Sequence, residues 1–298
     1  MSKIGALEAG GTKMVLGIFT EAGEELDRLT LPTLTPAETL PPMRAFFDGH
    51  GIDALGIGSF GPLALNEQAH NYGSITSTPK LAWRDFPLLP ALRGERSIPC
   101  AMDTDVNAAV LAEAELGVAK GLTDVVYITV GTGVGGGVLS GGRLVHGLLH
   151  PEVGHMLLRP HPDDPNPRGV CPYHDGCLEG LAAGPAIGAR IGGDARDLPD
   201  DHPTFRIEAE YLAQMCVNLI MTLSPQCIIL GGGVMQREAL YPLVRARTQA
   251  LLGGYVQSPA VLEHIDRMIV PPALFPVSGL VGSYLLGKQA LDRTRAKG

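Results

Sequence analysis

The sequence is poor in aromatic and charged residues, and it has neither a long apolar run nor a cluster of basic residues. Of its 298 residues, 5% are aromatic and 18% are charged, and the formal net charge at pH 7 is −8. An acidic chain without a basic patch lacks the electrostatic footprint of a nucleic-acid binder, so we expect no nucleic-acid partner. The longest apolar stretches, such as residues 216–223 (CVNLIMTL), fall far short of the roughly 18 residues of a membrane span. We therefore expect no membrane partner.

Cysteine is also scarce, and no secretory leader is visible. The chain has five cysteines, which are too few for a disulfide framework in a protein of this length. Their odd number indicates buried thiols or metal ligands. The first residues, MSKIGALEAGG, contain neither an apolar leader segment nor a cleavage site. We expect a cytoplasmic protein that acts on small molecules.

The chain does contain enough apolar residues for a large packed core. Hydrophobic residues make up 45% of it, and at roughly 100–200 residues per domain its length suggests two domains. Each half opens with a strand, a glycine-rich turn and a second strand, at residues 4–19 and again at 124–145. This repeat predicts an internal duplication with a boundary near 117–123. A helix predicted over 277–291 is expected to pack back on the first domain.

The first glycine turn, Gly10-Gly11-Thr12-Lys13, has the composition of a phosphate-binding turn. Glycines let backbone N–H groups converge on an anion, while the threonine hydroxyl adds a donor and the lysine adds positive charge. A strand and not a helix follows, so the turn is not a Walker A loop, and it resembles the phosphate hairpin of the actin and hexokinase type of fold. The alternative is an ordinary hairpin.

The second glycine turn, Gly131-Thr132-Gly133, follows a β-branched strand at residues 124–130. Together with Gly136 it matches the GxGxxG pattern of dinucleotide-binding proteins. That pattern must open a helix, because the pyrophosphate rests on the helix N-terminus. Residues 138–145 are strand-like instead, so a second phosphate hairpin is favoured.

Two carboxylates, in Asp103-Thr104-Asp105, follow a predicted strand and precede an alanine-rich helix over 105–117. A carboxylate at this place can accept the proton of a substrate hydroxyl that attacks a phosphoryl group. The alternative is that Asp105 only caps its helix. Because open α/β sheets build their sites at the carboxyl ends of strands, the position favours the catalytic interpretation.

Four possible metal ligands lie in a region rich in proline and glycine. They are His155, Cys171, His174 and Cys177, with the spacing H-x15-C-x2-H-x2-C. Two thiolates and two imidazoles would close a tetrahedral zinc site, and four protein ligands leave no open position, so the zinc should be structural. His150 or His161 could replace His155.

Polar residues flank this loop, and a triple glycine follows a later strand. Glu152, His155 and Glu179 could accept or donate hydrogen bonds to sugar hydroxyls, although a solvated loop is the alternative. Gly231-Gly232-Gly233 follows the apolar run CIIL, where a nucleoside could lie flat against the backbone.

The ordered set of motifs resembles one protein family. EAGGTK, GSFGPL, ITSTPKLAW, DTDVNAAVLAEAELG, VGTGVGGGV, HPEVGHM, CPYHDGCLEG and IILGGGV follow one another as in the ROK (repressor, open reading frame, kinase) sugar kinases, and in particular their bacterial fructokinase branch. The resemblance spans residues 4–287. It implies an α/β fold of two ribonuclease H-like domains, of the actin/hexokinase type, with an interdomain cleft. Residues 1–117 would form the sugar and phosphate domain, and 118–298 the nucleotide-binding domain with the zinc loop.

The resemblance also implies roles for single residues. Asp105 would be the general base, and Mg²⁺ would accompany ATP. Phosphates would be held by Gly10, Gly11, Thr12, Lys13, Gly131, Thr132, Gly133 and Gly184, and adenosine would face Gly231, Gly232 and Gly233. The sugar site would be lined by Thr104, Glu152, His155 and Glu179. Zinc would be bound by His155, Cys171, His174 and Cys177.

Two departures from the wider family narrow the expected substrate. Glu8 stands where most members have Asp, and Thr104 replaces an Asn that contacts the sugar in glucokinases. We therefore expect ATP-dependent phosphorylation of D-fructose at its 6-hydroxyl, with a glucokinase or mannokinase as the alternative. We also expect a homodimer. A sugar-responsive regulator is less favoured, because only nine residues precede the first glycine turn and leave no room for a DNA-binding module.

Overall fold

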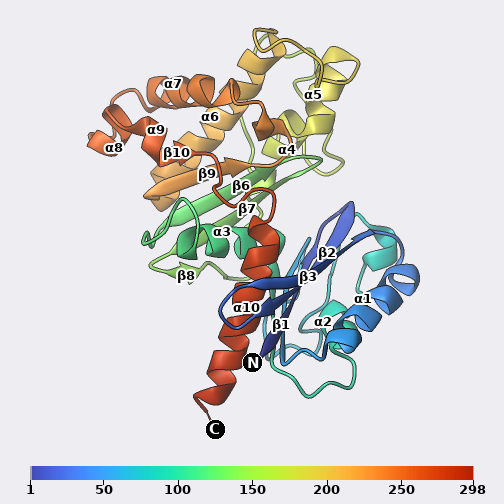
Figure 1. The fold of residues 1–298 in the computed structure, drawn as a ribbon. Coiled ribbons are helices and arrows are strands. Elements are labelled where there is room, and N and C mark those ends of the chain that lie inside the picture. Colours follow the sequence, from blue (N-terminus) through green and yellow to red (C-terminus); the bar gives the residue numbers. More distant parts are fainter. Residues whose placement is uncertain (1, 298) are drawn as a thin grey trace. The chain divides into compact units, whose positions relative to one another are not determined.

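The computed structural model describes residues 2–297, which form two compact units, each built on a five-stranded sheet (Figure 1). The first unit comprises the chain up to Glu115, the segment Val145–His150 and the chain from Pro276 onward. The second comprises Leu116–Leu144 and Pro151–Phe275. This division differs from a single boundary at residue 117, because the chain returns twice to the first unit.

The first sheet has the strand order β3-β2-β1-β4-β5. Its strands are β1 (Lys3–Ala9), β2 (Lys13–Thr20), β3 (Glu25–Pro32), β4 (Ala54–Ser59) and β5 (Cys100–Thr104). β1 and β2 form an antiparallel hairpin that pairs Ala9 with Met14, while β4 runs parallel to β1 and β5 parallel to β4. β3 escapes prediction from the sequence because its residues are mostly exposed and lack the apolar run of the other strands.

The helices of the first unit are α1 (Pro36–His50), α2 (Leu88–Arg93), α3 (Asp105–Glu115) and α10 (Ser278–Arg295), with a 3₁₀ turn η1 (Leu81–Trp83). The last of them, α10, packs on β1, β4 and α3. It approaches so closely that a Cβ on Gly56 would lie 1.8 Å from the Ser283 carbonyl oxygen. Likewise a Cβ on Gly282 would lie 1.8 Å from the carbonyl oxygen of Ala108. Glycine at these positions is what lets the C-terminal helix return to this sheet.

The second sheet has the order β10-β9-β6-β7-β8. Its strands are β6 (Val125–Val130), β7 (Val134–Ser140), β8 (Arg143–Leu144), β9 (Cys227–Gly231) and β10 (Ile269–Val270). The helices are α4 (Leu178–Ala182), α5 (Gly184–Ile191), α6 (Thr204–Leu223), α7 (Leu240–Leu252), α8 (Pro259–Leu262) and α9 (Ile265–Met268), with 3₁₀ turns η2 (Val153–His155) and η3 (Val234–Gln236). Again a hairpin, β6–β7, is followed by a parallel strand, β9.

The two sheets share one topology, because 8-7-6-9-10 in the second repeats 3-2-1-4-5 in the first. The structure therefore confirms the predicted duplication and the predicted class, an α/β fold of two ribonuclease H-like domains of the actin/hexokinase type. Within residues 2–297, no helix combines the length and the apolar composition that crossing a bilayer requires.

Candidate active site

The first phosphate turn lies between β1 and β2, where the sequence predicted it. Gly10 closes the turn, since its N–H donates to the Lys13 carbonyl at 2.9 Å and its own carbonyl accepts from the Thr33 hydroxyl at 2.7 Å. Gly11, Thr12 and Lys13 are exposed, so their donors are open to a ligand. Gly10 thus fixes the conformation of the turn, and the three residues that follow it are accessible to a ligand.

Lys80 lies against this turn and was not predicted from the sequence. A Cβ on Gly11 would lie 3.2 Å from Lys80 Cε. Within residues 2–297 the Lys80 ammonium makes no ion pair, so its positive charge adds to that of Lys13 at the turn. No local pattern distinguishes Lys80 from a solvated loop lysine, and only the folded chain brings it to Gly11.

Asp105 begins α3 directly after β5. The cap of this helix is the preceding residue, because Thr104 Oγ1 accepts the backbone N–H of Asn107 at 3.0 Å. Asp105 Oδ1 accepts the neighbouring N–H of Val106 at 2.9 Å, and the backbone N–H of Asp105 also favours its carboxylate. The helix therefore does not depend on Asp105 for its cap. Thr104 itself is buried, 4% exposed, and its hydroxyl keeps its proton and one lone pair for further partners.

Asp105 interacts electrostatically with a second carboxylate, Glu8 on β1. Desolvation by the surrounding protein raises the pKa of Asp105 from 3.8 to about 6. Burial, and next the charge of Asp105, raise the pKa of Glu8 to about 7, against the opposing charge of Lys13. A hydrogen bond from the Leu280 backbone N–H at the start of α10 also favours the Glu8 carboxylate. Two neighbouring carboxylates whose negative charge is incompletely balanced are a donor set that fits Mg²⁺.

A hydrogen-bonded group surrounds Asp103, two residues before Asp105. Asp103 Oδ1 accepts from the Thr104 N–H at 2.8 Å and from Asn107 Nδ2 at 2.7 Å. Asp103 Oδ2 lies 2.9 Å from His146 Nε2. His150 is buried and accepts the Leu63 N–H on Nε2 at 3.1 Å. Both histidines thus bind groups of the first unit.

The second phosphate turn brings together four predicted residues of the second unit. Gly131 N–H donates to the Gly133 carbonyl at 2.9 Å, and the Gly131 carbonyl accepts the N–H of Gly184 at 2.7 Å. Glu179 Oε2 accepts the Val134 N–H at 3.0 Å, so a Cβ on Gly133 would collide with it at 2.6 Å. Glu179 therefore supports the phosphate turn, and its place at the sugar stays a prediction.

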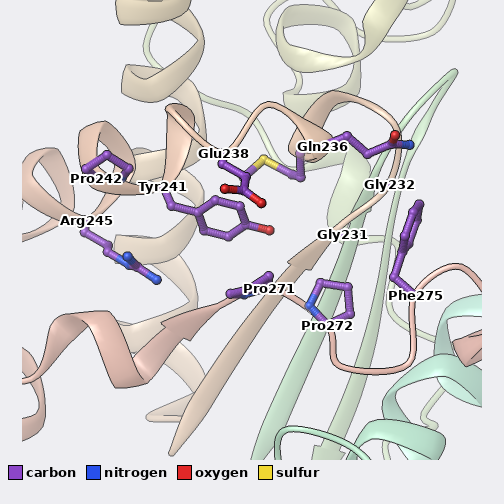
Figure 2. A pocket seen from close by; sticks show the side chains of 11 residues that line it. Gly231, Gly232, Gln236, Glu238, Tyr241, Pro242, Arg245, Pro271, Pro272 and Phe275 are labelled. Carbon is purple, nitrogen blue, oxygen red and sulfur yellow. The ribbon is translucent and has the colours of Figure 1, made fainter.

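A cavity of about 590 Å³ opens beside the triple glycine (Figure 2). Its lining includes Gly231, Gly232, Gln236, Tyr241 and Phe275. Gly232 has φ 89°, and a Cβ there would lie 2.4 Å from the Val130 carbonyl oxygen. Only glycine is therefore accommodated at this position. The Tyr241 hydroxyl donates to the carbonyl of Leu230 at 2.5 Å and fixes the ring in the wall. A planar base would fit between such a wall and the glycine backbone.

The four predicted metal ligands come together in the second unit. One ligand atom from each of His155, Cys171, His174 and Cys177 can be chosen so that all lie within 4.8 Å of one another. Cys171 Sγ is 3.7 Å from His174 Nδ1, and Cys177 Sγ is 3.8 Å from His155 Nδ1. Zinc bonds of standard length at tetrahedral angles would place S and N roughly 3.5 Å apart. The cluster therefore fits zinc, and it includes His155 and not His150.

The remaining residues near this cluster do not join it. His161 Nδ1 accepts the Asp163 N–H at 3.1 Å, and His146 and His150 bind the first unit. Glu152 is exposed, and its carbonyl accepts the His155 N–H at 3.0 Å in the turn η2. Several histidines lie at similar sequence distances from the two cysteines, so only the fold shows which of them belongs to the metal cluster.

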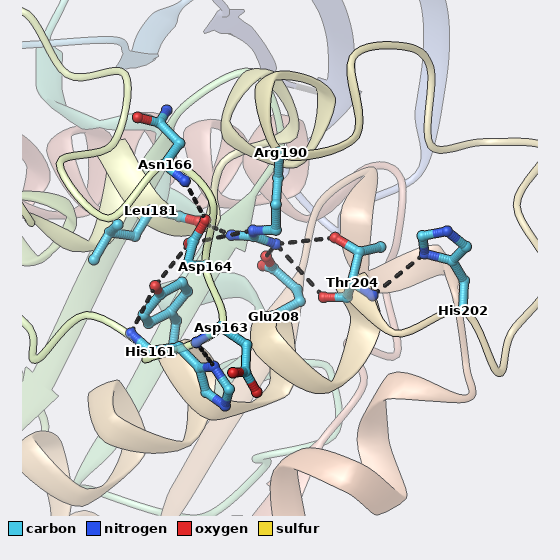
Figure 3. Close-up of polar contacts among 10 residues, drawn as sticks. His161, Asp163, Asp164, Asn166, Leu181, Arg190, His202, Thr204 and Glu208 are labelled. Atoms are coloured by element: carbon cyan, nitrogen blue, oxygen red, sulfur yellow. Dashed lines mark hydrogen bonds and ion pairs between the residues drawn. The ribbon is translucent and has the colours of Figure 1, made fainter.

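A buried ion cluster supports α5, the helix that starts at Gly184 (Figure 3). The Arg190 side chain is 3% exposed and lies 3.3 Å from Asp164 Oδ2 and 3.4 Å from Glu208 Oε2. It also donates to the Leu181 carbonyl at 2.5 Å. Glu208 Oε1 has no hydrogen-bond partner in the described part of the chain, and burial raises the pKa of Glu208 to about 8. One arginine thus faces two carboxyl groups, and burial favours the protonated form of Glu208.

The effect of Glu208→Gln on stability should therefore depend on pH. A folded pKa above the unfolded 4.5 means that the native state prefers the protonated acid, so the wild type loses stability as the pH rises through 8. The amide cannot ionise and avoids this loss. We expect similar melting temperatures near pH 5 and a higher one for the variant above pH 8, measured by scanning calorimetry.

Arg190→Met, in contrast to Glu208→Gln, should lower the stability of the protein. It leaves two buried carboxyl groups without their cation, which costs about 3–5 kcal/mol for a broken buried pair. A variant as stable as the wild type at pH 8 would show that the cluster does not hold α5.

Comparisons with known proteins agree over nearly the whole length. The ROK family model matches residues 4–290. A fructokinase of Pediococcus pentosaceus is 46% identical over 97% of this chain and 98% of its own. A fructokinase of Zymomonas mobilis subsp. mobilis is 39% identical over 97% of each chain. The crystal structure of ROK hexokinase from Thermus thermophilus has a TM-score of 0.74 at 27% identity, covering 98% of this chain and 99% of that one.

Proposed function

The chain belongs to the ROK family, and on that premise we propose that it is a fructokinase, which transfers the γ-phosphoryl group of ATP to the 6-hydroxyl of D-fructose. The observation that carries the choice of hexose is the 46% identity, over nearly full length, to a fructokinase. The geometry adds the parts that phosphoryl transfer needs: two glycine turns, lysines and a carboxylate at a strand end.

Asp105 is the base in this proposal. At pH 7 a carboxylate with a pKa of about 6 is mostly ionised, yet it binds a proton more readily than an ordinary aspartate. Its hydrogen bond to Val106 fixes the carboxylate, and the cap on Thr104 fixes the start of the helix. Asp105 would take the proton of the 6-hydroxyl as the oxygen attacks phosphorus.

The glycine turns and the lysines hold the phosphates. Open N–H groups of Gly11 and Thr12 and the charges of Lys13 and Lys80 would bind phosphate oxygens in the first unit. The turn Gly131–Gly133 would do so in the second. Mg²⁺, bound with ATP, would neutralise phosphate charge, and Glu8, whose carboxylate interacts with that of the base Asp105, would help to position it.

Adenosine would occupy the cavity beside Gly231 and Gly232 (Figure 2). The cavity is walled by Tyr241, Pro272 and Phe275, which offer flat apolar surfaces to a base. Structural Zn²⁺ would be held by the cluster of His155, Cys171, His174 and Cys177. A homodimer stays a prediction of the resemblance, and light scattering of the purified protein would test it.

Coupled release of ADP from MgATP tests the substrate. Fructose, mannose, glucose and N-acetylmannosamine are offered separately, and we expect kcat/KM for fructose to exceed the others by about ten-fold or more. A preference for glucose would support the assignment as a sugar kinase but contradict the assignment of fructose as its substrate. If no sugar leads to release of ADP, the second candidate, a non-catalytic sugar-responsive regulator, is favoured. Calorimetry would then detect binding of fructose without turnover.

A further inference from the structure

The segment Val145–His150 leaves the second unit after β8 and belongs to the first. It carries two histidines, and each is bound by a group of the first unit. His150 is buried, and its Nε2 accepts the backbone N–H of Leu63. His146 is bound through Nε2 to the carboxylate of Asp103. The segment is thus attached to the first unit at two points.

The contact between Asp103 and His146 fixes the direction of the imidazole. The side chain of Asp103 is 6% exposed, and its other oxygen already accepts two hydrogen bonds, from Thr104 N–H and Asn107 Nδ2. A carboxylate held in this way accepts the Nε2 proton of His146 at 2.9 Å. The same hydrogen bond raises the pKa of His146, against the opposing effect of burial.

The other ring nitrogen of His146 is open. The His146 side chain is 39% exposed, and Nδ1 has no hydrogen-bond partner within residues 2–297. A histidine whose one nitrogen is held by a buried carboxylate presents its second nitrogen in a fixed direction. Its holder, Asp103, lies on β5 two residues before Asp105, at the carboxyl end of a strand, where ligands of open α/β sheets bind.

We propose that His146 is a hexose-binding residue, whose Nδ1 forms a hydrogen bond with a hydroxyl group of the acceptor sugar, and that Asp103 is its positioning residue. This inference rests on the proposed function. A sugar hydroxyl both donates and accepts, so it can bind Nδ1 of the neutral ring and Nδ1–H of the charged ring. The contact orients the hexose and takes no part in the transfer of the phosphoryl group.

The variant His146→Gln separates this role from anchoring. The glutamine amide can still donate to Asp103, but it offers no second nitrogen. We expect the dissociation constant of fructose, titrated calorimetrically without ATP, to rise about ten-fold. KM for fructose should rise with it, while kcat, KM for ATP and the melting temperature stay near the wild-type values. An unchanged fructose affinity in the folded variant would overturn the proposal.

Asp103→Asn tests the positioning role. An amide in place of the carboxylate holds the ring less firmly, so KM for fructose should rise and kcat should change less. A fall in kcat at unchanged KM would contradict positioning. If this variant does not fold, His146→Ala, which leaves Asp103 and its two other hydrogen bonds in place, must itself weaken fructose binding, and unchanged binding there overturns the proposal.

The matched control is His50→Ala. His50 Nε2 lies 3.1 Å from Asp27 Oδ2, and its side chain is 29% exposed, so this variant breaks a comparable histidine–aspartate contact outside the candidate site. It should bind fructose as the wild type does, and an equal loss of affinity would count against the proposal. Failure of the proposed function is distinguishable, because then the wild type itself neither binds fructose nor releases ADP.

Discussion

Asp105→Asn should give a folded protein whose kcat is lower by about 10²–10⁴-fold, the usual contribution of general base catalysis. The amide oxygen can still accept the N–H of Val106, but it cannot take a proton from a hydroxyl. Coupled ADP release with fructose measures the effect. Comparable turnover in the variant would remove Asp105 from its proposed role.

Stability and pH dependence provide the controls. Because burial raises the folded pKa of Asp105 above its unfolded value of 3.8, ionisation at Asp105 costs stability as the pH rises through about 6. At pH 7 the asparagine variant should therefore be at least as stable as the wild type in thermal unfolding. In the wild type, kcat/KM should fall as the pH drops below about 6, where the base becomes protonated. A profile that stays flat down to pH 5 would contradict the assignment.

Cys177→Ser should cost the protein its zinc, much of its stability and its affinity for ATP. Structural zinc contributes about 10–16 kcal/mol in small zinc-binding domains, so the loop of residues 157–177 should loosen without it. Cys177 precedes α4, and Glu179 on that helix supports the second phosphate turn through Val134. We therefore expect a lower melting temperature, rapid proteolysis of the loop and a raised KM for ATP.

Metal analysis of the freshly purified wild type comes first, with one zinc per chain expected. The matched control is Cys100→Ser, a partly buried cysteine outside the cluster, which should keep the zinc and the KM for ATP. No zinc in the wild type, or full zinc in Cys177→Ser, would refute the ligand set.

The sequence predicted the parts of this protein that depend on neighbours along the chain. Alternating apolar runs and glycines define both hairpins, the run before Asp105 places it at a strand end, and the spacing of Cys171, His174 and Cys177 defines most of a metal cluster. Such patterns can be recognised in the sequence because local composition determines backbone conformation and short loops.

Tertiary structure decided everything that joins distant residues. It selected His155 over His150 and His161, brought Lys80 to Gly11, and bound His146 to Asp103, 43 positions away. The return of the C-terminal helix to the first unit was predicted, but the glycines that allow its close approach, Gly56 and Gly282, were identified only in the structure. These contacts form where buried charge must find a partner and where backbones approach closely, and both conditions are set by packing in three dimensions and not by the order of residues.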